Sequence, residues 1–199
     1  MTNHLGAFAC AALISIAAGA ADKPDAAKPA TPAPAAAKLP HYAQTGGTLE
    51  FTFDQGDAAS KGSFKKFATT LDYDEKNPAT GKLNVTVQIA SIDTQDKDRN
   101  DLLVGVDLFD APKFSTATYS GTLAKAGAGL EAVGKLTIRG VAKDVRLPLT
   151  VRPSANGLEL SGEVKIKRLD FGVGQGEWKS TESVGDGVTI TYKVALAKS

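Results

Sequence analysis

Apolar and polar residues alternate along most of the chain beyond residue 48. Leu49, Phe51 and Phe53 alternate with polar residues, and the longest regular alternation runs from Val188 to Leu196. Successive side chains of a β-strand point to opposite faces, so this period predicts strands with one apolar and one polar face. We predict eight of them, at about 49–53, 67–73, 83–89, 115–123, 130–138, 145–151, 158–166 and 188–196.

Short turn motifs separate several of these strands. They are Asn77-Pro78-Ala79-Thr80-Gly81, Gly127-Ala128-Gly129, Arg139-Gly140-Val141 and Asn156-Gly157. Asn-Gly is a strong signal for a tight hairpin, and strands joined by tight turns pair antiparallel with their neighbours. The sequence therefore predicts an all-β, antiparallel domain. Eight strands can close into a barrel around side chains or one small ligand, and a two-sheet sandwich is the alternative.

The apolar faces of these strands supply the candidate interior. This set is rich in Phe, Leu, Val and Ile and has few polar members, which suits a filled core and an apolar pocket equally well. The positions that we predict to contact a ligand are Phe51, Phe53, Leu71, Val85, Val87, Leu136, Leu147, Leu160, Val164, Ile190 and Tyr192, with Phe109 and Trp178 near the openings. Plain core packing is the alternative role for each.

An insert from Ser91 to Pro112 interrupts the alternation. It predicts a short helix from Gln95 to about Val104, with Asp93 or Thr94 as its N-cap. Asp96, Asp98 and Asn100 match positions 1, 3 and 5 of a calcium-binding EF-hand loop. Asp101 and Asp107, however, stand where that loop needs Gly and Glu. We therefore predict a solvated helix and no metal site.

A glycine-rich segment, Arg168–Trp178, lies between the last two predicted strands. It contains Gly172, Gly174 and Gly176. No helical pattern opens at its last glycine and no Lys-Ser/Thr follows, so it lacks the features of a phosphate-binding loop. It predicts a bent barrel rim, with Trp178 over the mouth as a ligand cover or a structural plug.

The N-terminal region has a different character. Leu5 to Ala18 is apolar, and Ala18-Gly19-Ala20 fits the cleavage pattern of a secretory signal. We predict a signal peptide over 1–20, a Pro/Ala/Lys-rich linker over 21–40 and a β-domain over 41–199, with export to the periplasm. A buried N-terminal helix is the alternative for the first segment.

Composition disfavours several kinds of chemistry. The single cysteine, Cys10, lies within the predicted signal, and His41 would be the only histidine left after cleavage. Thiolate nucleophiles and Cys-ligated metals then have no residue to use, and a Ser-His-Asp triad would have to use His41. The formal net charge of +1 offers no basic field for nucleic acid. We predict a non-enzymatic protein without cofactor or metal.

Six motifs in order resemble the YceI family. They are Ser91-Ile-Asp-Thr94, Asp107-Leu-Phe-Asp110, Gly134-Lys-Leu-Thr-Ile-Arg-Gly140, Val145-Arg-Leu-Pro-Leu149, Leu169-Asp-Phe-Gly-Val-Gly174 and Val184-Gly-Asp-Gly-Val188. The resemblance covers about Gly47 to Ala197. It implies an exported, lipocalin-like barrel of eight antiparallel strands that holds long apolar molecules such as polyisoprenoids. It also implies a possible membrane partner of the cytochrome b561 type.

The sequence departs from the family pattern at two polar sites. Leu49-Glu-Phe-Thr-Phe-Asp54 lacks the His-Ser pair often found in the first strand. The segment 99–103 keeps Arg99 and Leu103 of an Arg-Asp-x-His-Leu motif but lacks its Asp and His. Ligand contacts by those missing residues cannot be assigned to this chain.

The leading hypothesis is thus a periplasmic protein that binds an isoprenoid-like or other long apolar lipid, with quinones among the candidates. A ligand-free accessory or stress-response protein that docks on a membrane partner is the alternative, and a hydrolase ranks last.

Overall fold

The computed structural model describes residues 38–56 and 58–199. The predicted signal peptide (1–20) and most of the predicted linker (21–40) lie outside these residues. The strands are β1 (His41–Gln55), β2 (Ala58–Phe64), β3 (Phe67–Asp72), β4 (Lys82–Gln88), β5 (Ile92–Asp93), β6 (Thr116–Ala126), β7 (Gly129–Ile138), β8 (Val141–Ser154), β9 (Gly157–Lys167) and β10 (Val184–Lys198).

The helical elements are short. They are η1 (Pro78–Thr80), η2 (Ile89–Ser91), α1 (Lys97–Leu103), η3 (Leu169–Phe171) and η4 (Gly176–Lys179). Within the described ranges, none is long and apolar enough to cross a membrane.

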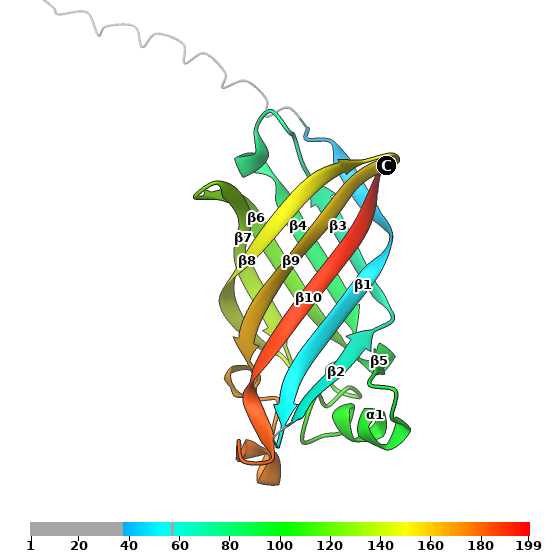
Figure 1. The fold of residues 1–199 in the computed structure, drawn as a ribbon, viewed down its shortest axis with the longest axis vertical. Helices are drawn as coiled ribbons and strands as arrows, with labels where there is room; N and C mark the ends of the chain where they lie inside the picture. The colour runs from blue at the N-terminus through cyan, green and yellow to red at the C-terminus, as the bar shows by residue number, and fades with distance from the viewer. Residues whose placement is uncertain (1–37, 57) are drawn as a thin grey trace, which may run out of the picture. The chain divides into compact units, whose positions relative to one another are not determined.

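The sheet closes on itself as an antiparallel barrel (Figure 1). Its strands follow the order β10-β9-β8-β7-β6-β4-β3-β1, and β1 pairs back onto β10. That closing ladder runs from Tyr42↔Lys198 to Gln55↔Val184, along nearly the whole of both strands. The predicted eight-stranded barrel is therefore confirmed, and the two-sheet sandwich is excluded because a sandwich would leave β1 and β10 unpaired with each other.

β2 and β3 are two parts of one barrel strand. Both pair with β1 in the same register, as Glu50↔Ser63 and Ala43↔Thr70 show. The strand is interrupted at Lys65 and Lys66, whose backbone N–H groups donate to the carbonyl and the hydroxyl of Ser91 (both 3.0 Å). β5 in turn pairs with β2 beyond the end of β4.

The alternation does not predict β2, because two of its inward positions, Ser60 and Gly62, carry little apolar bulk. Gly62 lies opposite Phe51. A Cβ at Gly62 would approach the Phe51 ring to 2.3 Å, so the aromatic ring of one strand fills the space over the glycine of the next. This cross-strand arrangement leaves no apolar alternation in Ala58–Phe64.

Tight hairpins connect the strands from β6 to β9. Ile138 pairs with Val141 across Arg139 and Gly140, whose φ angles of 50° and 74° match a type I′ turn. The predicted hairpin at Asn156-Gly157 exists one residue earlier, because Ser154 pairs with Gly157. Ala155 and Asn156 therefore make the turn.

The predicted helix of the insert is present but begins later, at Lys97. Its N-cap is Asp96, whose carboxylate accepts from the Arg99 N–H (3.0 Å), and not Asp93 or Thr94 as predicted. Thr94 instead donates its N–H and hydroxyl to the Asn100 side-chain oxygen (2.8 and 2.7 Å). Two of the residues that suggested a calcium loop thus stabilise the helix and its entrance.

The barrel interior has two differently filled halves. The half near the β8–β9 hairpin, which we call the packed half, is filled by side chains with almost no exposed surface: Leu71, Leu83, Leu123, Ala132, Leu158, Leu160 and Leu196. The half near α1 holds a second cluster: Val87, Ile89, Leu108, Ala117, Ile138, Phe171 and Val173. Partly buried side chains pack against both clusters: Leu49, Phe67, Val85, Leu136 and Val145.

The close approach of β6 to β7 predicts an intolerant glycine. A Cβ at Gly134 would lie 2.0 Å from the Ser120 carbonyl oxygen, whereas one at Gly187 would have nothing within 4 Å. Gly134→Ala should therefore lower the free energy of unfolding by about 1–3 kcal/mol, and Gly187→Ala should leave it within about 1 kcal/mol. Urea denaturation of both variants measures this. Equal stabilities would contradict the close packing.

Candidate ligand-binding site

A cavity of about 230 Å³ lies inside the barrel, on the α1 side of the packed half. Leu83 and Leu160 belong to both the packed cluster and the cavity wall, so they mark its inner end. One water molecule needs roughly 10–15 Å³, so the space is more than ten times that of a single water. Apolar protein cavities of comparable size bind small apolar molecules.

Nearly all the predicted ligand-contact positions lie on the wall of this cavity. They are Phe51, Phe53, Val85, Val87, Phe109, Leu136, Leu147, Leu160, Val164, Trp178, Ile190 and Tyr192. Leu71 is not among the wall residues, because it lies fully buried inside the packed half. Alternation identifies the inward face of a strand but not the depth of a residue along the barrel.

Some wall residues in the middle of the barrel are more exposed than the filled core. Val85, Leu136 and Ile190 point inward on continuous strands yet are only half-buried, whereas Leu123 and Leu196 in the packed half are 2% exposed. Since the strands on either side of Val85, Leu136 and Ile190 are paired, their accessible surface faces the cavity. The middle of the barrel is underfilled.

One aromatic residue of the cavity wall, Phe64, lies outside the strands that the alternation predicts. Phe64, on the unpredicted strand β2, lies 5.4 Å from Phe51 and 6.2 Å from Phe109 between ring centroids. These rings link three separate segments of the chain at the α1 end of the cavity. The pairing of Gly62 with Phe51 is the signal that places Phe64 on the same inward face.

Two tyrosines cover the inner end of the cavity. The Tyr119 hydroxyl lies 2.7 Å from the Ala132 carbonyl and 3.2 Å from that of Val145, and the Tyr192 hydroxyl donates to the Pro148 carbonyl (2.5 Å). Burial raises the pKa of Tyr119 to about 12, with Glu131 adding to the effect. Burial also raises the pKa of Tyr192. Both hydroxyls are therefore neutral at physiological pH.

The glycine-rich segment forms the rim around a buried arginine. Arg168 is 6% exposed, and its guanidinium donates to the carbonyls of Val173, Trp178, Ser180, Val184 and Gly185 at 2.7–3.1 Å. A guanidinium has five N–H donors, so every one is used. Burial lowers the pKa of Arg168, an effect that Asp186 opposes.

These five carbonyls, which we call the cradle of Arg168, explain why residue 174 is a glycine. A Cβ at Gly174 would lie 2.0 Å from Nη1 of Arg168, so only glycine lets the backbone wrap this closely. Trp178 lines the cavity, and its carbonyl is one of the five acceptors. The predicted rim is present, and Arg168 is the group that orders it.

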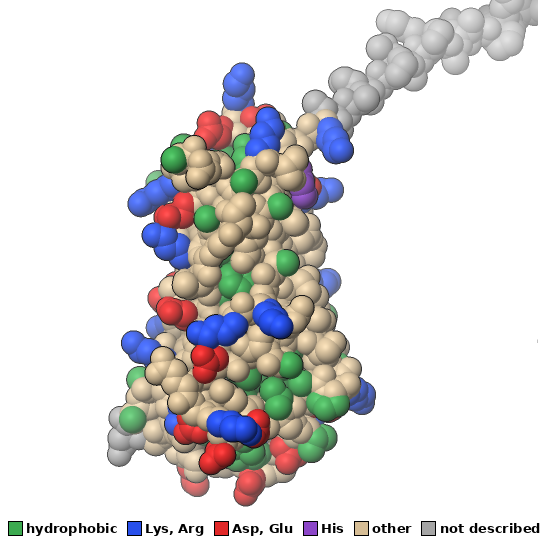
Figure 2. Space-filling view, turned by 90° about the vertical axis from the view of Figure 1, so that its right-hand side faces the viewer, with side chains coloured by type: hydrophobic (Ala, Val, Ile, Leu, Met, Phe, Trp, Pro, Cys, Tyr) green, Lys and Arg blue, Asp and Glu red, His purple; other side chains and the backbone are tan. Residues whose placement is uncertain are grey.

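The cavity wall reaches α1 at the surface. Leu103 and Phe109 line it there, and Leu102, also a wall residue, is 45% exposed. Arg99 is the charged wall residue of this helix, and its guanidinium lies 3.8 Å from the Asp96 carboxylate. Figure 2 shows hydrophobic side chains gathered on the lower part of this face of the barrel.

Most side chains of the cavity wall are apolar. His41 does not line the cavity; its Nδ1 lies 2.6 Å from an Asp72 carboxylate oxygen, where β1 meets β3. Burying each CH₂ group contributes about 0.8 kcal/mol. A long hydrocarbon chain therefore gains binding free energy against an apolar wall without specific polar contacts.

Comparisons with known proteins agree with this geometry. A family model described as the YceI-like domain matches residues 42–196. The protein YceI of Escherichia coli is 36% identical over an alignment of 121 positions, and the match covers 56% of this chain. The match spans 62% of the length of that relative.

Two solved structures also match the fold of this chain. The chain matches Burkholderia cenocepacia BcnA with a TM-score of 0.73 and 36% identity, covering 76% of this chain and 96% of BcnA. It also matches a polyisoprenoid binding domain from Saccharophagus degradans with a TM-score of 0.65 over 81% of this chain and the whole of that one. At 16% identity, the second likeness shows the fold alone.

Because Arg168 donates five hydrogen bonds, we expect its substitution to cause a large loss of stability. Arg168→Met would leave five carbonyls without their donor in a buried site, and we expect the free energy of unfolding to fall by about 3 kcal/mol or more. Arg152→Met, at an exposed arginine of β8, should change it by less than about 0.5 kcal/mol. Urea denaturation followed by Trp178 fluorescence compares them. Similar midpoints for the two variants would contradict the role of the cradle.

The buried tyrosines predict a loss of stability at high pH. The pKa of Tyr119 rises from 10.0 to about 12 on folding, so the unfolded chain releases this proton first. Its stabilising contribution is complete below pH 10 and is lost as pH rises toward 12. Absorbance titration should show a tyrosine ionising near pH 12 that is absent in Tyr119→Phe. Ionisation of every tyrosine near pH 10 would disprove it.

Proposed function

The chain belongs to the YceI-like domain family, and from that premise we propose that it is a non-catalytic binding protein that holds one long apolar lipid inside its barrel. The underfilled, apolar middle of the barrel carries this proposal. Half-buried inward side chains such as Val85 and Leu136 retain surface that a hydrocarbon chain would cover.

An isoprenoid-like chain is the ligand class that fits best. A five-carbon isoprene unit contributes roughly 3–4 kcal/mol when fully buried, and association costs about 4–15 kcal/mol. About three to five buried units would therefore be needed for firm binding. The Saccharophagus degradans domain of the same fold is described as polyisoprenoid-binding, which supports the same class. Isoprenoid quinones belong to it.

We place this function in the periplasm. The support is the apolar segment Leu5–Ala18 followed by Ala18-Gly19-Ala20, which has the form of a secretory signal. Fractionation of cells that express the full chain checks this placement, and recovery in the cytoplasmic fraction would contradict it.

One observation favours a second candidate, an accessory protein that docks on a membrane partner such as a cytochrome b561-type protein. Leu102 and Val106, in and just after α1, are 45% and 65% exposed. Large exposed apolar side chains at one site are typical of contact surfaces. Such a role would not need the cavity.

If the cavity binds lipid, added bulk on its wall should weaken the binding. Val85→Phe and Val164→Phe place extra bulk on the wall, and we expect each to weaken the binding of geranylgeraniol at least tenfold while the barrel stays folded. Val133→Phe adds the same bulk on an exposed side chain of β7 and should leave the affinity unchanged. Titration followed by Trp178 fluorescence gives the affinities.

Mass spectrometry of lipid extracted from the purified chain identifies the natural ligand. Absence of any co-purifying lipid, together with no geranylgeraniol binding by the unsubstituted chain, would sink the lipid-binding proposal and favour the accessory role.

A further inference from the structure

The junction between β8 and β9 is paired along only half its length, and β1 is likewise unpaired on its β2–β3 side between Ala43 and Glu50. The β8–β9 ladder runs from Ser154↔Gly157 to Thr150↔Ser161 and stops there, although β8 extends back to Val141 and β9 on to Lys167. On their other sides both strands stay paired through this region, β8 with β7 and β9 with β10. We call the unpaired stretch, 141–149 of β8 beside 162–167 of β9, the seam.

The sequence itself stops this ladder. Pro148 has no N–H to donate, and its carbonyl accepts from the Tyr192 hydroxyl (2.5 Å). A Cβ at Gly162 would lie 2.2 Å from that hydroxyl and 2.3 Å from the Pro148 oxygen. The Tyr192 side chain of β10 therefore crosses β9 over Gly162. Its hydroxyl donates to the Pro148 carbonyl of β8, where the β8–β9 ladder ends.

Ion pairs on the outer surface join β8 to β7 along the seam, and β9 to β10 at the neighbouring ladder. On β8, Asp144 pairs with Lys135 of β7 (2.9 Å) and Arg146 pairs with Glu131 of β7. On β9, Glu159 pairs with Lys193 of β10 (3.2 Å). Among the residues that the structure describes, no ion pair joins β8 to β9.

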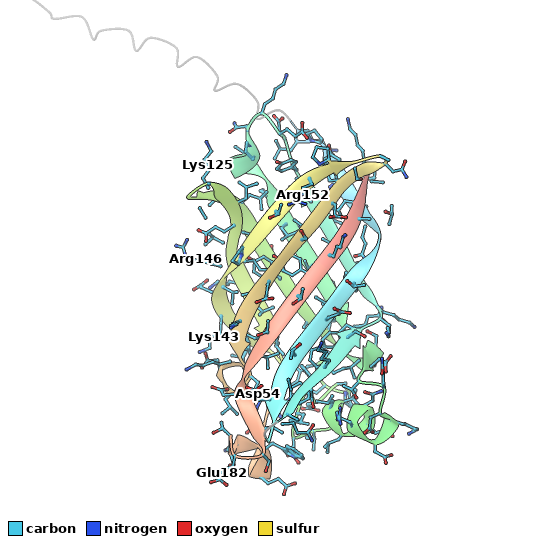
Figure 3. The ribbon with its side chains drawn as sticks, in the orientation of Figure 1. Asp54, Lys125, Lys143, Arg146, Arg152 and Glu182 are labelled. Atoms are coloured by element: carbon cyan, nitrogen blue, oxygen red, sulfur yellow. The ribbon has the colours of Figure 1, made fainter. Side chains whose placement is uncertain are left out.

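Continuing the ladder would bring like charges together. In the register of Arg152↔Glu159, Arg146 would lie opposite Lys165, and like charges directly opposite destabilise a strand pair; Asp144 would lie opposite Lys167, an opposite-charge pair. Figure 3 labels Arg146 and Arg152 on β8, one on each side of the point where pairing ends.

The cavity lies directly behind the seam. Val145 and Leu147 of β8 and Val164 and Ile166 of β9 all line it, and all four are half-buried. A hydrocarbon chain between these strands would contact apolar side chains on both sides.

We propose that the seam is a lateral opening through which the hydrocarbon chain of the ligand enters and leaves the barrel. This rests on the proposed lipid binding. Parting β8 from β9 here breaks no ladder hydrogen bonds, whereas parting a paired junction costs about 0.5–1.5 kcal/mol for each bond. A long chain would then pass sideways through a slot and need not thread end-on past the α1 end.

A cross-link across the seam tests the opening. The full chain with Cys10→Ser has no other cysteine, so Arg146→Cys with Lys165→Cys can be joined by a cleavable bismaleimide. Arg152→Cys with Glu159→Cys, on the same two strands within the ladder, is the matched control. Stopped-flow Trp178 fluorescence measures geranylgeraniol uptake. We expect the seam cross-link to slow uptake at least tenfold, cleavage to restore it, and the control cross-link to have no effect.

The outcomes separate the two proposals. Equal uptake rates with both cross-links would overturn the opening and leave lipid binding standing, whereas no uptake by the unlinked chain would overturn both. Amide hydrogen exchange of the unsubstituted protein adds a test that needs no cross-link. Amides of 162–167 and 141–149 that face the seam should exchange at least tenfold faster than those of the β8–β9 ladder, and equal protection would overturn the opening.

Discussion

Closure of the sheet through the β1–β10 ladder is the constraint on which the rest of this structure depends. Because β1 pairs with β10 along nearly its full length, the barrel has a fixed circumference and the alternating side chains of every strand are divided into an inner and an outer set. The inner set then has a limited volume to fill. Leucines fill it completely at one end, and the middle stays open.

Aromatic rings and glycines shape the boundary of that open space together. Phe51 covers Gly62 and Tyr192 covers Gly162 on the neighbouring strand, so each ring lies against the wall and leaves the centre free. The Tyr192 hydroxyl also donates a hydrogen bond to the Pro148 carbonyl of β8. The same contact thus limits the cavity at its inner end and marks the end of the β8–β9 ladder. At the other end Arg168 orders the rim from within, and none of the described charged side chains makes a hydrogen bond with it.

The sequence predicted the barrel and most wall positions because both depend on local alternation. It missed β2, since Gly62 gives its inward space to a ring from β1. It placed Leu71 with the wall residues, since periodicity carries no measure of depth along the barrel. It assigned the helix cap to Asp93 or Thr94, whereas the side chain of Asp96 makes that bond, because three neighbouring residues all had the chemistry to do so.

The sequence by itself determined that this chain forms antiparallel strands with one apolar face, and it contains a single cysteine, Cys10. Those properties depend on residue type and on spacing within a few positions. Only the tertiary structure decided where the interior is filled and where it is open, which carbonyls receive the five donors of Arg168, and where the β8–β9 ladder ends. Each of these depends on the register between segments distant in the chain, which alternation within one strand does not specify.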